Sequence, residues 1–320
     1  MESWALDVIA RIFSLPVPPN VNRDTPDPES LPVIPDDDAA WELTKTPEAV
    51  AFNKHLAAYT EGHDLAPAQK IAPNLILKNL NPFESYNCSF VRAHTNIPVP
   101  QPRYTHLKQF FVADLIPGRM LLECWDSLSS FYQFRIACTL RGYVSQMRRV
   151  TSDRPGGIKL GHVRGVLFDP NLWNGPFRDV ETFRNWIVNI TYLDRVHRDQ
   201  GFRMKNPNMP PPPTPPLPEL LPDSEWNLVL THCDLSLSNI ILSDDGVLWV
   251  IDWEWGGFYP PWIESRGMKR YTWAPASWKR WFTFIAGASD NTDHIWSHMD
   301  DIASAYATSV PREDYWPDQL

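Results

Sequence analysis

The sequence predicts an α+β protein with two lobes, a small lobe of strands and helices followed by a larger, mainly helical one. Two strand-like apolar runs lie early, at 74–78 and 108–118, whereas apolar residues at helical spacing dominate later. A single hairpin-like segment, 228–254, interrupts the helical part. The chain has 320 residues, enough for two lobes with a substantial core.

Residues 1–40 predict an N-terminal arm that carries one short helix. The start, MESWALDVIARIFSLPVPP, lacks a basic opening and is broken by Pro16. We therefore expect an amphipathic helix packed on the body, and not a signal peptide or a membrane span. Residues 17–40 are rich in Pro and Asp, so we expect an extended or partly disordered arm that buries little.

The small lobe is predicted over 41–115. A helix is expected from residue 41 onward, in WELTKTPEAVAFNKHLAAY, and a short strand in NLILK, 74–78. The run KQFFVADLIPG, 108–118, predicts a buried strand that ends at a Pro-Gly turn and connects the lobes.

Between these strands, 81-NPFESYNCSFVRAHT-95 begins with residues typical of a helix start. Asn81 can cap the helix, Pro82 suits its first turn, and Glu84 stands three residues after the cap, as in a capping box. A helix is therefore expected here.

The large lobe is predicted over 116–320. Apolar residues at helical spacing predict helices over 127–150 and about 179–197, and the tail from 262 also reads as mostly helical.

A polyproline insert interrupts the large lobe at 210–222. The simplest interpretation is a stiff surface loop. The alternative is a docking site for a partner that reads proline-rich segments.

Composition restricts the partners and the compartment. The net charge of −9 argues against a nucleic-acid binder, which needs a basic face. The four cysteines are scattered with no metal-ligand spacing: Cys88, Cys124, Cys138 and Cys233. We expect reduced thiols and a cytoplasmic protein, with neither nucleic-acid nor membrane partners.

The chain is also rich in tryptophan, with 15 residues. Large aromatic side chains are usually core residues, but several could line an aromatic-walled ligand cavity. The candidates are Trp173, Trp186, Trp255, Trp262, Trp273 and Trp278.

The segment 231-THCDLSLSNIILSDDGVLWVIDWEW-255 carries polar residues that a buried hairpin does not need. His232, Asp234 and Asn239 form H-x-D-x-x-x-x-N, and Asp252 ends the apolar strand that follows. The turn SDDG, 243–246, should bring Asn239 and Asp252 close together.

Phosphoryl transfer from Mg-ATP needs these residue types. A carboxylate must orient the acceptor hydroxyl and take its proton, and a neutral oxygen and a second carboxylate must hold Mg²⁺. Asp234 suits the first role, and Asn239 and Asp252 suit the second. We interpret His232 as a scaffold residue that fixes the catalytic loop by hydrogen bonds, in preference to a catalytic base.

This block, with the following GGFYPP, resembles the aminoglycoside phosphotransferase/choline kinase family, and especially its fungal members. The resemblance covers about residues 41–290 and includes 90-FVRAHTNIPVP-100 and 164-RGVLFDPNLWNGPF-177. It implies a protein-kinase-like fold, with a small N-terminal β-sheet lobe and a larger helical C-terminal lobe. It also implies a catalytic Asp234, magnesium ligands at Asn239 and Asp252, the cofactors ATP and Mg²⁺, and a small-molecule hydroxyl acceptor.

The resemblance extends to the nucleotide site. It places Lys78, in 75-LILK-78, on the ATP phosphates and Glu84 as the acid that pairs with this lysine, although the capping role of Glu84 remains an alternative. FVADLIPG resembles the strand that meets adenine, so Asp114 would present a carbonyl and Leu115 an amide to the base.

One departure keeps other functions open. In the family, a phosphate-covering loop precedes the position of Lys78. Here that region has a single glycine, Gly62, and two prolines, Pro67 and Pro73. The protein could therefore be a non-enzymatic kinase-fold binding protein, or an enzyme recruited to a non-kinase biosynthetic step.

Overall fold

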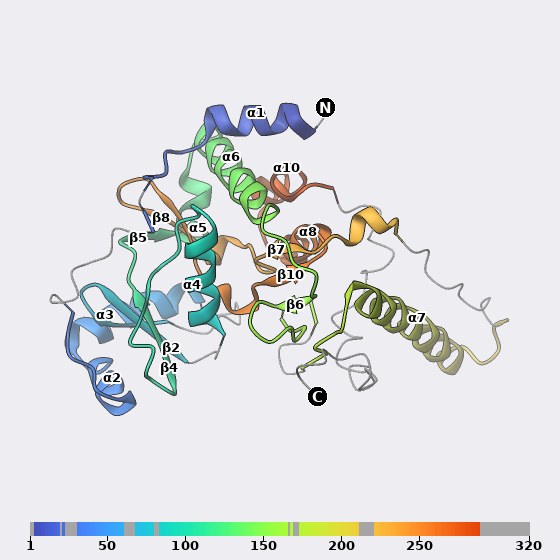
Figure 1. Ribbon diagram of the computed structural model, residues 1–320, viewed down its shortest axis with the longest axis horizontal. Helices are drawn as coiled ribbons and strands as arrows, with labels where there is room; N and C mark the ends of the chain where they lie inside the picture. Colours follow the sequence, from blue (N-terminus) through green and yellow to red (C-terminus); the bar gives the residue numbers. More distant parts are fainter. Residues whose placement is uncertain are drawn as a thin grey trace. The chain divides into compact units, whose positions relative to one another are not determined.

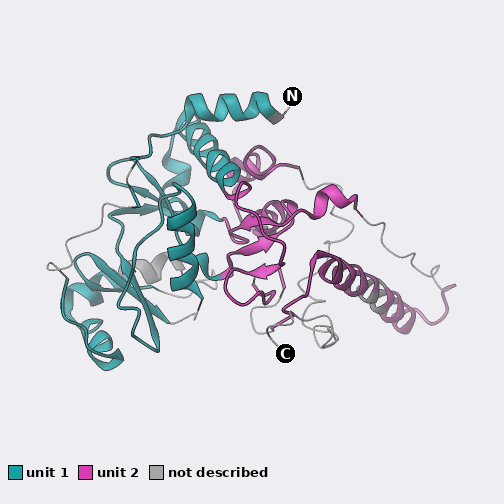
Figure 2. Ribbon diagram, in the orientation of Figure 1, with its two compact units in different colours: residues 1–146, 236–254 teal, residues 147–235, 255–320 magenta. Residues whose placement is uncertain are grey.

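The computed structural model describes residues 3–19, 21–22, 31–60, 68–79, 83–165, 167–168, 173–210 and 221–288. The chain forms two compact units (Figure 2). Unit 1 comprises residues 1–146 and 236–254, and unit 2 comprises 147–235 and 255–320. The predicted α+β class is confirmed, since each unit combines helices with antiparallel strands. The lobe boundaries at 40 and 115 stay a prediction.

A four-stranded antiparallel sheet of order β1-β2-β4-β3 organises the first part of unit 1 (Figure 1). Its strands are β1 (Gln69–Ala72), β2 (Leu75–Asn79), β3 (Pro102–Arg103) and β4 (Phe110–Asp114). The predicted strands at 74–78 and 108–118 are thus confirmed as β2 and β4, with Lys78 opposite Phe111. Because strand side chains alternate, Leu75 and Leu77 enter the core while Lys78 points to the other face.

Among the described residues, six helices begin in the first segment of unit 1. They are α1 (Ser3–Phe13), α2 (Asp37–Leu43), α3 (Pro47–Thr60), α4 (Glu84–His94), α5 (Leu121–Cys124) and α6 (Ser130–Met147). The single helix expected from residue 41 is wrong, because the chain breaks between α2 and α3. Pro47 has no amide hydrogen to continue a helix, but it fits a first turn, and Thr46 Oγ1 accepts the Ala49 amide at 3.3 Å.

The N-terminal arm buries more than its composition suggests. Ile34 and Ala40 are buried in the cluster beneath the four-stranded sheet. The Tyr104 hydroxyl donates to the Pro32 carbonyl, and the His106 ring contacts the Ile34 carbonyl at 3.0 Å. The expectation of an extended arm that buries little is therefore wrong at residues 31–40, since Ile34 packs into the core and residues 37–40 already belong to α2.

The predicted helix at 81–95 is present as α4, but it starts later. Its first helical residue is Glu84, and the preceding Phe83 makes no side-chain cap. Asn81 and Pro82 lie outside the described residues. Glu84 is therefore not the third helical residue that the capping-box interpretation requires.

A second sheet of unit 1 contains a hairpin over residues 240–250 only; Val229–Thr231, at the start of the predicted hairpin 228–254, belongs instead to the sheet of unit 2. The strands of this second sheet are β5 (Gly118–Met120), β8 (Ile240–Ser243) and β9 (Leu248–Val250), in the order β5-β8-β9, with 3-10 turns at Trp125–Ser127, Leu237–Asn239 and Trp253–Trp255. Gly246, with φ of +83°, supplies the left-handed residue of the turn. The Ile251 amide donates to the Asn239 carbonyl at 3.0 Å, so the hairpin brings Asn239 next to the segment of Asp252.

Unit 2 contains a three-stranded sheet of order β6-β10-β7 and most of the later helices. Its elements are β6 (Gly156–Gly157), α7 (Val180–Lys205), a 3-10 turn (Asp223–Trp226), β7 (Val229–Thr231), β10 (Gly257–Tyr259), α8 (Trp262–Arg270), α9 (Ala276–Lys279) and α10 (Phe282–Ala286). The predicted helix near 179–197 begins with a capping box at Asp179 and continues to Lys205. Residues 211–220 of the polyproline insert and the tail 289–320 lie outside the described residues.

The tryptophans divide between core and surface. Trp186, Trp262 and Trp278 are buried, whereas Trp173 and Trp273 are 46% and 40% exposed. The interpretation of these tryptophans as core residues is therefore right for only some of them.

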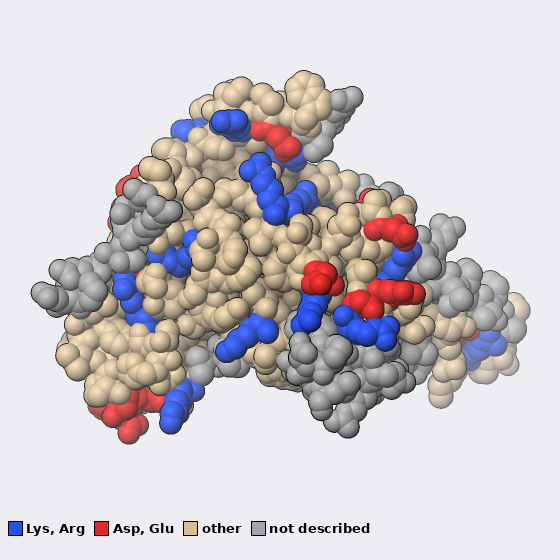
Figure 3. Space-filling view, viewed as in Figure 1, with Lys and Arg blue, Asp and Glu red and all other residues tan. Residues whose placement is uncertain are grey.

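The four cysteines are free and buried. Among the helices that the structure describes, none is long and apolar enough to cross a membrane. On the face shown in Figure 3, acidic and basic side chains are interspersed in small groups. The cytoplasmic location stays a prediction.

Candidate active site

Lys78 is the centre of a charged cluster in unit 1. Its Nζ lies 2.7 Å from Glu84 Oε2 and 2.7 Å from Asp252 Oδ1. The ammonium also lies 5.9 Å from the centroid of the Phe111 ring, its partner across the sheet. Three elements therefore meet at this lysine: β2, the first turn of α4, and the residue two positions after β9.

Helix α4 also fixes the backbone beside Asp252. Asn87, one turn after Glu84 and buried, donates from Nδ2 to the Trp253 carbonyl at 2.8 Å. Asp252 itself has a φ of +65°, a left-handed conformation that is uncommon for a residue with a side chain. Such conformations concentrate at functional sites, because the surrounding structure must hold them in place.

The cluster contains more negative than positive groups. Carboxylate oxygens of Glu84, Asp252 and Glu254 lie within 4.8 Å of one another, around one lysine. Burial alone lowers the pKa of Lys78, but the charges of Asp252, Glu84 and Glu254 outweigh it and raise that pKa well above its usual value. Burial raises the pKa of Glu84 to about 8, against the opposing effect of Lys78. Carboxylate oxygens are ligands that Mg²⁺ prefers, so the grouped oxygen donors of this cluster fit a divalent cation such as Mg²⁺.

Two adjoining cavities surround the cluster within unit 1. The smaller, of about 110 Å³, has Lys78, Glu84, Asn239 and Asp252 in its wall. The larger, of about 380 Å³, is mostly apolar and is bordered by the segment 114–120. Both are lined by Ala68, Ile76, Pro100, Met120 and Ile251. A charged end and an apolar end thus share one wall, and the larger cavity is of the size that binds small ligands.

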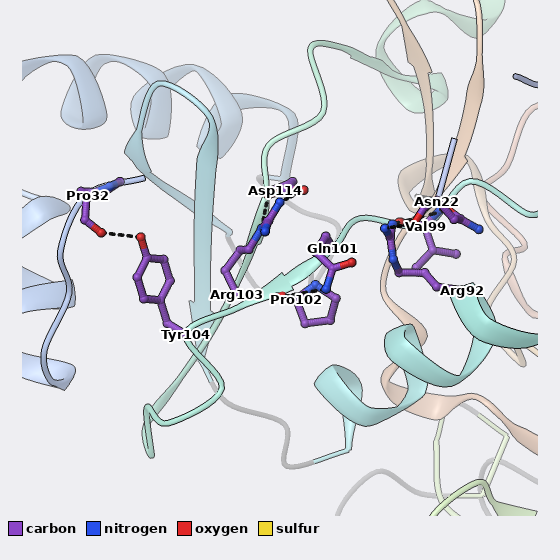
Figure 4. Close-up of polar contacts among 9 residues, drawn as sticks. All are labelled: Asn22, Pro32, Arg92, Val99, Gln101, Pro102, Arg103, Tyr104 and Asp114. Carbon is purple, nitrogen blue, oxygen red and sulfur yellow. Dashed lines mark hydrogen bonds and ion pairs between the residues drawn. The ribbon is translucent and has the colours of Figure 1, made fainter. Parts of the chain in front are cut away.

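The expected adenine contacts are only partly available. Asp114 lines the larger cavity, and its carboxylate is held by Arg103 through two hydrogen bonds of 2.7 and 3.0 Å (Figure 4). The Leu115 amide, however, donates to the Asn74 carbonyl at 2.8 Å. Presenting this amide to a base would require that bond to break, so the contact assigned to Leu115 does not fit the conformation in the structure.

A second set of contacts in unit 2 holds the loop of Asp234. The His232 amide donates to Glu264 Oε2 at 2.6 Å, and the Asp234 amide donates to His232 Nδ1 at 3.2 Å. Between them, Cys233 has a left-handed φ of +69°. His232 is buried and bonded to the loop backbone, a geometry that suits a scaffold role.

One side of α8, together with the residue that follows it, meets this loop at three places. Glu264 accepts the His232 amide, Gly267 packs so closely that a Cβ there would overlap the Cys233 carbonyl oxygen, and the Tyr271 hydroxyl donates to Asp234 Oδ1. Positions 264, 267 and 271 are spaced i, i+3 and i+7, which places them along one side of a helix. Burial raises the pKa of Glu264 to about 7, although the two loop amides and Arg148 oppose the shift.

The structure groups the expected residues in two sets. Lys78, Glu84, Asn239 and Asp252 line one cavity in unit 1. His232 and Asp234 lie together in unit 2. The convergence of Asp234 with Asn239 and Asp252, and the catalytic and binding roles of all these residues, stay predictions.

Sequence reasoning missed four residues of these sites. Glu254 follows Asp252 in the motif DWE, so its presence near the cluster could have been inferred. Glu264, Gly267 and Tyr271 were visible only as a helical spacing after the motif, with nothing to indicate which surface they contact.

No protein-family model and no curated protein matches the sequence. Solved structures do resemble the fold at low identity. A thermostable mutant of aminoglycoside phosphotransferase APH(4)-Ia, in complex with ADP and hygromycin B, is 14% identical, covering 75% of this chain and 82% of its own at a TM-score of 0.43. Choline kinase LicA from Streptococcus pneumoniae is 12% identical, covering 78% and 84% at a TM-score of 0.36.

Spectinomycin phosphotransferase APH(9)-Ia, in complex with ADP and spectinomycin, is 16% identical, covering 75% of this chain and 77% of its own at a TM-score of 0.39. These neighbours are small-molecule kinases. A place in the fungal branch of the family stays a prediction.

Proposed function

We propose that the protein is a phosphotransferase that uses ATP and Mg²⁺ to phosphorylate a hydroxyl group of a small molecule. The observation that carries this proposal is the cluster in which Lys78 contacts Glu84 and Asp252 at 2.7 Å each, in a cavity also lined by Asn239. A partly buried ammonium surrounded by acids next to an apolar cavity suits a ligand with a metal-bound polyphosphate at one end and a flat base at the other.

Each residue of the cluster has a role in this proposal. Lys78 binds ATP phosphate oxygens, and Glu84 holds the lysine in position. Asn239 and Asp252 are the oxygen ligands for Mg²⁺, with Glu254 as a nearby additional acid. The ion would neutralise phosphate charge as it develops during transfer.

Asp234 carries out the acceptor side of the reaction. Its carboxylate orients the acceptor hydroxyl and accepts the proton as the acceptor oxygen bonds to the γ-phosphorus. The bond from the γ-phosphorus to its bridging oxygen breaks, and ADP leaves. The proposal therefore requires Asp234 to meet the γ-phosphate that Lys78 and Mg²⁺ hold.

A thermal-shift titration tests nucleotide binding. Mg-ATP at 100 times its Kd should stabilise the wild type by about 2.7 kcal/mol, because the ligand binds the folded state only. Lys78→Met should lose most of this shift. Lys70→Met is the matched control, since Lys70 lies on the neighbouring strand β1 and pairs with Glu48 outside both cavities.

The two outcomes separate the proposal from its alternatives. If millimolar Mg-ATP leaves the melting temperature unchanged, the proposal of a kinase is wrong. A shift without any phosphoryl transfer would favour a kinase-fold binding protein, or an enzyme recruited to another reaction. The acceptor can then be identified by mass spectrometry. A panel of hydroxyl-bearing metabolites is incubated with the protein and Mg-ATP, and the acceptor is the one that gains the mass of one phosphoryl group.

A further inference from the structure

The carboxylate of Asp234 already has a hydroxyl group bonded to it. The Tyr271 hydroxyl donates a hydrogen bond to Asp234 Oδ1, and the Asp234 residue is only 6% exposed. This is the same bond that the proposed reaction requires from the acceptor, whose hydroxyl must donate to that carboxylate before transfer. The tyrosine therefore stands where an acceptor hydroxyl would stand.

The position of Tyr271 in the chain makes this contact releasable. Tyr271 directly follows the last residue of α8, so it can move without unwinding the helix that holds the loop through Glu264. Its ring lies 5.4 Å from the Trp273 ring in an edge-on arrangement, and Trp273 is 40% exposed. The aromatic pair thus reaches from the buried carboxylate toward the surface of unit 2.

We propose that Tyr271 guards the acceptor position: its hydroxyl occupies Asp234 until an acceptor hydroxyl replaces it. The inference rests on the proposed phosphotransferase function and adds a residue that discriminates among acceptors. Water is the smallest competing acceptor. A single water molecule cannot displace the tyrosine and also replace its ring contact with Trp273, whereas a larger acceptor that packs against Trp273 can do both.

Removing the guard opens a defined side reaction. A water oxygen bonds to the γ-phosphorus, the bond to the bridging oxygen breaks, and ADP and inorganic phosphate are released. Asp234 accepts the proton that the water loses. The Tyr271 hydroxyl suppresses this hydrolysis by holding the carboxylate that the water needs.

The experiment measures ADP released from Mg-ATP without any added acceptor. Tyr271→Phe keeps the ring against Trp273 and removes only the hydroxyl. We expect its hydrolysis rate to exceed the wild-type rate about tenfold or more, the factor expected for freeing a charged group from a hydrogen bond. Tyr104→Phe is the matched control, because it also removes a phenol hydroxyl bonded within the protein, to the Pro32 carbonyl, and should hydrolyse ATP at the wild-type rate.

A second variant shows whether the freed carboxylate is responsible. The increase should disappear in Tyr271→Phe combined with Asp234→Asn, because the amide cannot take the proton. An increase that persists in this double variant overturns the proposal. So does a Tyr271→Phe rate equal to or below that of the wild type, which would make the tyrosine a positioning residue for Asp234.

Two further measurements keep the inference separate from the proposed function. If Mg-ATP leaves the melting temperature of the wild type unchanged, both the proposed function and the proposed role of Tyr271 are wrong. A normal Mg-ATP shift in both wild type and Tyr271→Phe, with equal hydrolysis, removes the guard alone. An added phosphoryl group on Tyr271, seen by peptide mass mapping after incubation with Mg-ATP, also overturns the guard, because the phenol would then be an acceptor.

Discussion

In unit 1 the candidate phosphate site is held together by charge, whereas in unit 2 the loop of Asp234 is held by hydrogen bonds and close backbone packing. Lys78 depends on carboxylates that outnumber it. Asp234 depends on a buried histidine ring, a tyrosine hydroxyl and the helix α8, whose Glu264 accepts the amide of that histidine.

The difference predicts how each group of contacts should respond to substitution. Clustered carboxylates attract a cation, so the affinity of the cluster for a divalent ion should respond to the loss of any carboxylate. A loop fixed by directional bonds keeps one carboxylate in a set orientation, so its function should respond to geometry. Variants in the two units should therefore fail in different ways.

The largest expected effect is on the rate of transfer. Asp234→Asn should lower phosphoryl transfer to the screened acceptor by about 10²–10⁴-fold, the usual contribution of a general base. The Mg-ATP thermal shift should remain, because the cavity proposed to hold the nucleotide belongs to unit 1. Wild-type activity in this variant would remove Asp234 from its assigned role.

Asp252→Asn should affect binding first. The gain in ATP affinity that Mg²⁺ provides should fall by about 10–100-fold, as expected for the loss of one interaction with a charged group. Isothermal titration of ATP with and without Mg²⁺ measures it. Asp244→Asn, which changes an exposed acid in the turn of the same hairpin, is the control and should titrate like the wild type. An unchanged magnesium dependence in Asp252→Asn would contradict its metal role.

Glu264 predicts a pH dependence of stability. Its pKa is raised from 4.5 to about 7 by burial, so the folded state binds the proton more tightly than the unfolded state does. The free energy of unfolding should therefore be highest near and below pH 4.5 for this group, and should fall by about 3 kcal/mol as the pH rises to 7.

Urea unfolding between pH 4.5 and 8 measures this slope, with Glu264→Gln as the reference. The glutamine keeps an oxygen for the His232 amide but cannot titrate, so the variant should lose this part of the slope. Parallel curves for the two proteins would show that Glu264 does not titrate in this range.

The smallest expected effect is at the contact between α8 and the loop. Gly267→Ala should lower the free energy of unfolding by about 1–3 kcal/mol, because the new methyl group overlaps the Cys233 carbonyl. Gly201→Ala is the control: a Cβ at this position of α7 meets no atom within 4 Å, so the change should stabilise the helix by about 0.5–1 kcal/mol. Differential scanning calorimetry distinguishes the signs, and equal shifts would mean that α8 can move away from the loop.

Local patterns predicted local structure well. The apolar runs at 74–78, at 108–118 and on both sides of 243–246 were enough to predict β2, β4 and the hairpin of β8 and β9. Contacts between residues far apart in the chain could not be predicted from these local patterns. The break between α2 and α3 depends on Pro47, and the burial of Ile34 depends on a sheet that forms some 40 residues later.

The order of residues along the chain already specifies the chemical groups and their spacing: His232, Asp234, Asn239 and Asp252 around a hairpin, with Lys78 on an early strand. The ion pair between Lys78 and Asp252, 174 residues apart, and the bond from Tyr271 to Asp234 arise only when distant segments pack together. The physical reason is that spacing along the chain specifies which side of a strand or helix a residue occupies, whereas its partner depends on which distant surface packs there to bury apolar area and satisfy polar groups.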